Sequence, residues 1–139
     1  MKTVLVPYLN FNGTTREAMT FYQSILGGKL TFSTFGESGA PVSDSEKDNI
    51  MHADLSNDTL SFMASDGNAH QQVIMGNNVH MSIVGTDEAK ISEYFNKLGE
   101  GGKIDMPLEK QVWGDMFGML TDKFGVHWMV NISSGQPQK

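Results

Sequence analysis

The segment Val6-Pro7-Tyr8 leads, through a run with helical spacing, to Phe21-Tyr22 and then to Gly27-Gly28-Lys29-Leu30. The same order returns in the second half of the chain as Val79-His80-Met81, Tyr94-Phe95 and Gly101-Gly102-Lys103-Ile104. The strand segment and the aromatic pair recur at one spacing, and the Gly-Gly-Lys segment recurs at a spacing one residue longer. A repeat on this scale indicates duplicated supersecondary structure, so two units of similar plan fill the 139 residues.

The pattern within each unit predicts one strand, one helix and three further strands. Thr14 followed by Glu17 is typical of a capping box, and Gly27-Gly28 ends the helix that starts there. In the second unit, acidic residues at Asp87 and Glu88 open the corresponding helix. Alternating β-favouring residues predict strands over residues 3–10, 29–35, 49–55, 59–65, 79–84, 103–106, 116–121 and 126–132.

These elements predict an α+β fold of two tandem βαβββ modules, with curved mixed or antiparallel sheets and helices on the outer face. Units of this size are marginal alone, so we expect one domain over residues 1–139 with a shared core. Module one covers residues 3–66, a polar linker 67–77, module two 78–132 and a polar tail 133–139. A Gly/Ser/Pro/Asp-rich loop over residues 36–48 is expected to be mobile.

Composition excludes several classes of function. The net charge is −6 with the acidic residues dispersed, which disfavours binding to nucleic acid. Cysteine is absent, so disulfide scaffolds, thiolate metal sites and cysteine nucleophiles are excluded. The first apolar run is too short and interrupted for a signal peptide or a membrane span. We therefore expect a cytoplasmic protein that does not contact the membrane.

Strand alternation places three of the four histidines on the sheet face away from the helix. His80, His52 and His127 alternate with apolar neighbours that are expected to pack under the helices, and Met129 follows His127 on the same face. One interpretation is a cleft that offers imidazoles to a metal, a proton or a ligand. The other is that these histidines only hydrogen-bond neighbouring strands or solvent.

The chain resembles the PhnB-like branch of the glyoxalase/bleomycin resistance group within the vicinal oxygen chelate superfamily. The resemblance is carried by the early Pro-Tyr-Leu-x-Phe strand, by the Glu-Ala-x-x-Phe-Tyr helix, and by the run from Trp113 to Trp128. It covers nearly the whole chain and implies paired βαβββ modules that commonly complete their clefts as homodimers.

In metal-using members of that superfamily, ligands come from the first and last strands of each module. Carried over to this sequence, those positions fall on Pro7, His80, Met129 and, within residues 61–63, on Phe62 or Met63. Only His80 is an ordinary ligand for a hard divalent ion, because a thioether cannot replace a carboxylate. The residues at these positions therefore predict no cofactor, with His80 as the anchor ligand if a divalent metal binds at all.

The residues favour a protein that binds an apolar or aromatic small molecule without metal, and the resemblance implies that it does so as a homodimer. Trp113 lies beside a Gly-Asp pair and could cover a ligand, and the ten methionines suit an adaptable apolar pocket or simply core packing. The expected ligand-binding residues are His80, His52, Trp113, Met129, His127 and Met63. Two alternatives stay open: a metal-dependent isomerase, lyase or transferase anchored by His80, and an interaction module without a ligand.

Overall fold

The computed structural model describes residues 2–39, 41–67 and 72–134. Within them the chain forms two compact units, Met1–Ile74 and Met75–Lys139, whose boundary lies inside the predicted linker. Parts of the predicted linker and tail, residues 68–71 and 135–139, lie outside the described residues. Whether the two units share one core stays a prediction. Among the described residues, no helix is both long enough and apolar enough to cross a membrane.

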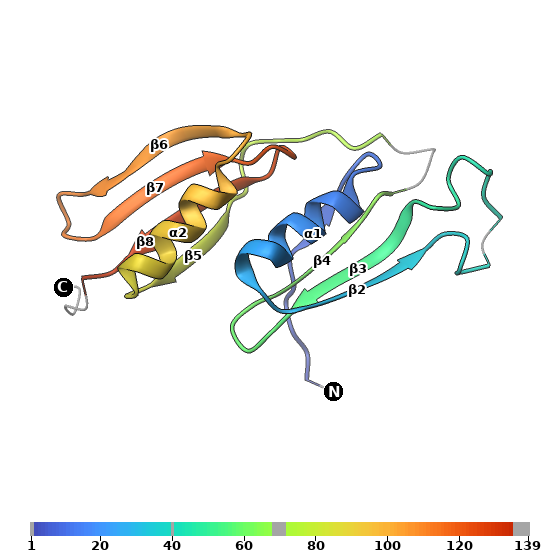
Figure 1. Cartoon of the computed structure of the whole chain (residues 1–139), viewed down its shortest axis with the longest axis horizontal. Helices are drawn as coiled ribbons and strands as arrows, with labels where there is room; N and C mark the ends of the chain where they lie inside the picture. Colours follow the sequence, from blue (N-terminus) through green and yellow to red (C-terminus); the bar gives the residue numbers. More distant parts are fainter. Residues whose placement is uncertain (1, 40, 68–71, 135–139) are drawn as a thin grey trace. The chain divides into compact units, whose positions relative to one another are not determined.

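Each unit has the predicted βαβββ order (Figure 1). The first unit contains β1 (Tyr8–Asn10), α1 (Thr15–Leu26), β2 (Lys29–Thr34), β3 (Ile50–Ser56) and β4 (Ser61–Ser65). The second contains β5 (Met81–Gly85), α2 (Glu88–Leu98), β6 (Lys103–Lys110), β7 (Met116–Thr121) and β8 (His127–Ile132). The α+β class predicted from the repeat is confirmed.

Each unit builds one open, mixed sheet of four strands. The strand order is β1-β4-β3-β2 in the first sheet and β5-β8-β7-β6 in the second. The first strand of each unit pairs in parallel with the last, and the other pairings are antiparallel. The last strand of each unit therefore lies between two neighbours, and the helix crosses one face of the sheet that this strand helps to complete.

Each helix packs on one face of its own sheet. In the first unit, the core joins Ala18, Met19, Tyr22 and Leu26 of α1 to alternate residues of the strands, and the Tyr22 and Phe62 rings meet edge to face at 5.9 Å. In the second unit, Ile91, Phe95 and Leu98 of α2 cover Leu120, Trp128, Val130 and Ile132. Gly118 of β7 allows this packing, because a Cβ there would lie 2.8 Å from the Phe95 ring.

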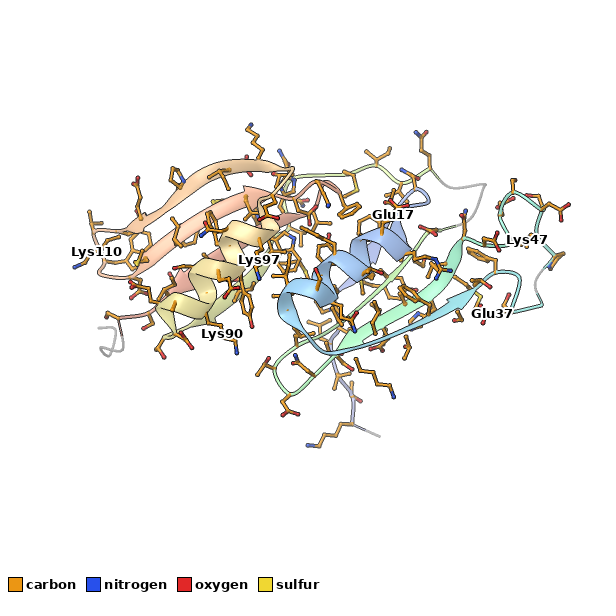
Figure 2. The ribbon with its side chains drawn as sticks, in the orientation of Figure 1. Glu17, Glu37, Lys47, Lys90, Lys97 and Lys110 are labelled. Carbon is orange, nitrogen blue, oxygen red and sulfur yellow. The ribbon has the colours of Figure 1, made fainter. Side chains whose placement is uncertain are left out.

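The side of α2 away from the sheet is charged. Figure 2 labels Lys90 and Lys97 on this helix, and Lys97 Nζ lies 2.7 Å from Glu93 Oε1 one turn earlier. The hydrogen bond that Lys97 donates to Glu93 raises the pKa of Lys97 above its ordinary value. This helical face is therefore an ordinary solvated surface, as expected for an exposed pair at this spacing.

The first predicted strand is shorter than expected. Residues 3–7 are not part of β1, and Val4 and Leu5 are 71% and 101% exposed. The ladder to β4 covers only three residue pairs, beginning at Tyr8 and Met63, with one further hydrogen bond from Met63 N to the Pro7 carbonyl. Pro7 has no N–H to donate, so the ladder cannot continue through it on the donor side.

The capping box predicted at Thr14 does not form. Thr14 is the N-cap residue of α1, but its side chain makes no capping hydrogen bond. Instead Asp66, which follows β4, accepts from Thr15 N at 2.9 Å and from Ile50 N at 2.7 Å. A carboxylate from a distant segment thus satisfies the helix end and ties it to the start of β3. The second helix behaves as predicted, since the Asp87 side chain accepts from Lys90 N at 3.1 Å.

A second difference is a β-bulge in β3. The register passes from Ser33 paired with His52 to Thr34 paired with Ile50, which leaves Met51 as the extra residue. Ile50 is consequently buried in the core, whereas Met51, which alternation places there, is only half-buried. Ala53 and Leu55 keep their predicted inward orientation, and His52 and Asp54 keep the opposite one.

We expect Asp66→Ala to destabilise the first unit by roughly 3 kcal/mol, because two buried backbone N–H groups lose their acceptor. Urea unfolding followed by far-UV circular dichroism measures this change. Thr14→Ala is the matched comparison and should cost no more than about 0.5 kcal/mol, since the hydroxyl makes no capping bond. Equal losses for the two variants would contradict the assignment of the cap to Asp66.

The same variant tests whether the units unfold together. Both tryptophans, Trp113 and Trp128, belong to the second unit, so their fluorescence reports its unfolding alone. If the predicted shared core exists, Asp66→Ala should lower the fluorescence midpoint as much as the circular dichroism midpoint. A fluorescence transition that does not move would show that the units unfold independently.

Candidate functional site

Each sheet has a face that its own helix does not cover, called here the open face. The registers define it, because side chains that pair across strands lie on the same face. On the first sheet the open face carries Tyr8, Asp54 and Met63, which pair with one another across three strands. On the second sheet it carries Ser82, Val84, Phe117, Met119, Thr121, His127, Met129 and Asn131.

The open face of the first sheet is polar and contains two of the predicted site residues. Tyr8 Oη lies 3.2 Å from His52 Nδ1, and the two rings are tilted with centroids 5.8 Å apart. Met63 lies between Tyr8 and Asp54 in the sheet. His52 therefore has a partner on β1, beyond the intervening strand β4, which agrees with the interpretation of this histidine as a structural residue.

On the second sheet, His127 forms the centre of a hydrogen-bonded chain. Its Nδ1 lies 2.9 Å from Thr121 Oγ1, and the Thr121 hydroxyl donates to Asp105 Oδ2 at 2.7 Å. Its Nε2 lies 2.9 Å from the Gly76 carbonyl, which can only accept. All three hydrogen bonds form together when both ring nitrogens carry a proton. His127 thus ties β8, β7 and the segment before β5 into one cluster.

His80 lies beside this cluster, just before β5. Its ring centroid is 5.5 Å from that of His127, with the planes tilted by 46°. Among the described residues His80 makes no hydrogen bond through its ring, whereas both nitrogens of His127 are engaged. Of the two neighbouring imidazoles, only His80 has nitrogens ready for a ligand.

The middle of the second open face is apolar. Met129 pairs with Met119 on one side and with Ser82 on the other. Phe117 lies two residues before Met119 on the same strand and the same face. Met119, Met129 and Phe117 are all half-buried. Flexible thioethers beside an aromatic ring form an adaptable apolar surface.

Trp113 extends this apolar surface from the turn between β6 and β7. The indole is 55% exposed and meets the Phe117 ring edge to face at 6.1 Å. The turn is held by Asp115, a carboxylate that is 3% exposed and accepts from Asn131 Nδ2 at 2.9 Å and from Ser134 N at 3.3 Å. Asp115 therefore fixes both the start of β7 and the orientation of Asn131.

The residues present do not fit the metal site that the superfamily resemblance implies. No group of three His, Asp or Glu side chains able to hold a metal ion occurs in the part of the chain that the structure describes. His127 would have to give up Thr121 or Gly76 to bind a metal, and Met129 offers only a soft sulfur. His80 is the one imidazole at this site that could ligate without losing a bond.

The strand registers change one sequence-based equivalence. The repeat aligned Pro7 with His80, but the ladders pair Tyr8 with Met63 and Ser82 with Met129. The first-strand residue beside Met63 is therefore Tyr8, one residue after the predicted Pro7. The first-strand residue beside Met129 is Ser82, two residues after the predicted His80. Leu9 instead pairs with Ala64, which is fully buried on the helix face.

The second unit brings together four of the six predicted site residues. His80 contacts His127, Met129 lies two residues further along β8, and Trp113 contacts Phe117, the strand partner of Asn131. His52 and Met63 belong to the open face of the other unit. Sequence reasoning missed Tyr8, Thr121, Asp105 and Asp115 as partners, because each acts through a cross-strand contact that only the register reveals.

Comparison with known proteins agrees with this fold and with the arrangement of its strands. The sequence profile of the Glyoxalase/Bleomycin resistance protein/Dioxygenase superfamily matches residues 6–130. Protein YjdN of Escherichia coli (strain K12) is 32% identical over 145 residues, covering 96% of this chain and 97% of YjdN.

Two solved structures are also similar. Protein PA1353 from Pseudomonas aeruginosa has a TM-score of 0.88 at 41% identity, covering 95% of this chain and 98% of that one. A Bacillus cereus protein described as a putative 3-demethylubiquinone-9 3-methyltransferase, PhnB protein, has a TM-score of 0.79 at 26% identity, covering 94% of this chain and 100% of that one.

Paired βαβββ units with one helix per mixed sheet define the class of protein. The chain belongs to the glyoxalase/bleomycin resistance protein/dioxygenase superfamily, in agreement with the resemblance seen in its motifs. Its similarity to the PhnB protein of Bacillus cereus places that branch among its structural neighbours. Membership establishes the fold and leaves the activity to the residues of the site.

We expect Thr121→Val to destabilise the second unit by about 1 kcal/mol, because the hydroxyl that joins His127 to Asp105 is lost. Urea unfolding followed by tryptophan fluorescence measures it, since both tryptophans lie in this unit. Thr121→Ser keeps the hydroxyl and is the control. If the serine and valine variants unfold at the same urea concentration, the chain of hydrogen bonds contributes nothing to stability.

Proposed function

We propose that this protein binds an apolar or aromatic small molecule, without metal, on the open face of its second sheet. The observation that carries this proposal is the continuous apolar surface formed by Trp113, Phe117, Met119 and Met129 on a face that α2 does not cover. Sites for small molecules combine such apolar surface with a few polar groups that fix orientation. Here Asn131, Ser82 and His80 border the apolar residues.

The donor chemistry supports binding without a metal. Methionine stands at the last-strand position in both units, as Met63 and Met129, and the ring nitrogens of His127 are already hydrogen-bonded. Hard divalent ions require three or four nitrogen or oxygen ligands, which these residues do not supply. The family description covers a resistance protein as well as glyoxalase and dioxygenase enzymes, so membership is compatible with binding alone.

The proposal includes a homodimer located in the cytoplasm, with no nucleic acid or membrane partner. An exposed apolar segment around Val4 and Leu5 precedes β1, whose outer edge has no strand partner among the described residues. Uncovered edges and apolar segments of this kind are suited to pairing with another chain. Light scattering at several protein concentrations tests the dimer, and a monomer at every concentration would contradict it.

Tryptophan fluorescence is expected to report ligand binding through Trp113 alone. Saturable quenching or enhancement should appear when a panel of hydrophobic aromatic compounds is titrated into the protein. Trp113→Phe should abolish the signal change, whereas the buried indole of Trp128, which donates to Asp122 Oδ2 at 2.8 Å, should not respond. Absence of saturable binding by every compound in the panel would contradict the proposal.

A charge placed in the middle of the apolar surface should prevent binding. Met129→Glu is expected to weaken the affinity for any compound found above by at least about tenfold, because binding would desolvate an unpaired carboxylate. Asn96→Glu adds the same charge on the exposed side of α2 and is the matched control. Isothermal titration calorimetry measures both, and an equal effect of the two variants would show that the ligand binds elsewhere.

A metal-dependent enzyme is the second candidate, favoured by the unengaged ring of His80 beside His127. On our proposal, elemental analysis of protein purified without chelator should find zinc, nickel and manganese well below one ion per chain. Stoichiometric metal that disappears in His80→Ala would favour the enzyme instead. His52→Ala is the control, because that histidine is engaged with Tyr8 in the other unit.

A further inference from the structure

The orientation of the Asn131 amide is set by a buried carboxylate. Asp115 Oδ2 accepts from Asn131 Nδ2 at 2.9 Å, while Asp115 Oδ1 accepts from Ser134 N at 3.3 Å. A carboxylate accepts and does not donate, so the NH₂ end of Asn131 must face Asp115. The amide oxygen, Oδ1, is thereby turned away from Asp115.

This oxygen lies at the border of the apolar surface. Asn131 pairs with Phe117 on one side and with Val84 on the other, and Met129 lies two residues before it on the same face. Asn131 is half-buried, and none of the donors in the described part of the chain reaches its Oδ1. The face thus presents one acceptor, held in a fixed orientation, beside an aromatic ring.

A ligand covering this surface would exclude water from Asn131 Oδ1. If the ligand supplies a hydroxyl or N–H at that point, the acceptor is satisfied; if it supplies only carbon or an ether oxygen, the acceptor is left without a partner. Leaving a polar group unsatisfied costs more than forming its hydrogen bond gains, so the site discriminates against ligands that lack the donor.

We propose that Asn131 selects ligands that carry a hydrogen-bond donor on an aromatic or apolar skeleton, such as phenols and N–H heteroaromatics. This inference rests on the proposed function and specifies its ligand class. Asp115 is the positioning residue, since it acts on the ligand only through the amide of Asn131.

Matched pairs of compounds that differ only in the donor test this selection. 2-Naphthol and 2-methoxynaphthalene, and indole and N-methylindole, are suitable probes for isothermal titration calorimetry with the full chain. The native protein should bind each donor compound about tenfold more tightly than its methylated counterpart. Asn131→Leu should remove this preference while the methylated compounds bind as before, and Asn96→Leu on α2 should change neither affinity.

Asp115→Asn gives a second, more specific readout. Because Ser134 N must still meet an oxygen, the new amide should place its NH₂ towards Asn131, which then turns its own NH₂ to the ligand. The preference should reverse towards compounds with an acceptor in place of the donor, such as 2-acetylnaphthalene over 2-naphthol. If Asp115 only supports the structure, Asp115→Asn would weaken the binding of both compounds equally and would not reverse the order of their affinities.

The outcomes separate this inference from the proposed function. If neither the donor compounds nor their methylated counterparts bind, the proposed function itself fails. If both series bind the native protein with equal affinity, and Met129→Glu abolishes that binding, the proposed function stands and the selection by Asn131 is overturned. A preference that persists unchanged in Asn131→Leu would assign the acceptor to another residue and would also overturn it.

Discussion

Each four-stranded sheet has a single helix of its own, and this constraint shapes the rest of the molecule. A helix covers one face, and alternate residues of each strand must then be apolar on that face only. The other face is free to carry chemistry. The two units use this freedom differently: the first presents Tyr8, His52 and Asp54, whereas the second presents methionines and aromatic rings between a histidine cluster and Asn131.

Buried carboxylates fix the ends of strands in both units. Asp66, Asp115 and Asp122 are each less than a tenth exposed, and each accepts at least two hydrogen bonds from N–H groups. Asp122 alone holds Phe124 N, Val126 N and Trp128 Nε1, so it forms the turn into β8 and also anchors the largest core side chain of that strand. In a chain without cysteine, these acids order the turns that disulfides or metals order elsewhere.

Much of this architecture follows from local pattern. Alternation and helical spacing predicted the βαβββ order and the orientations of Ala53, Leu55, His127, Trp128 and Val130, because burial on one face requires that periodicity. The errors lie where a distant contact decides. A β-bulge at Met51 keeps this residue out of the core, and Asp66 caps α1 in place of Thr14. Val79 was predicted to lie under α2, but it is 72% exposed just before β5. The alignment of Pro7 with His80 was wrong by one residue, and a shift of one residue exchanges the two faces of a strand.

The order of the strands makes each sheet depend on the carboxyl-terminal strand of its unit. β4 and β8 are the last strands of their units in sequence, yet each lies inside its sheet, between the first strand and the third. During synthesis β5 therefore emerges from the ribosome before β6, β7 and β8, and among the described strands β8 is the one that pairs with it. The second sheet cannot close until β8 has been made. Residues 2–7 belong to no strand, whereas deleting even a few residues of β8 removes a strand from inside the second sheet.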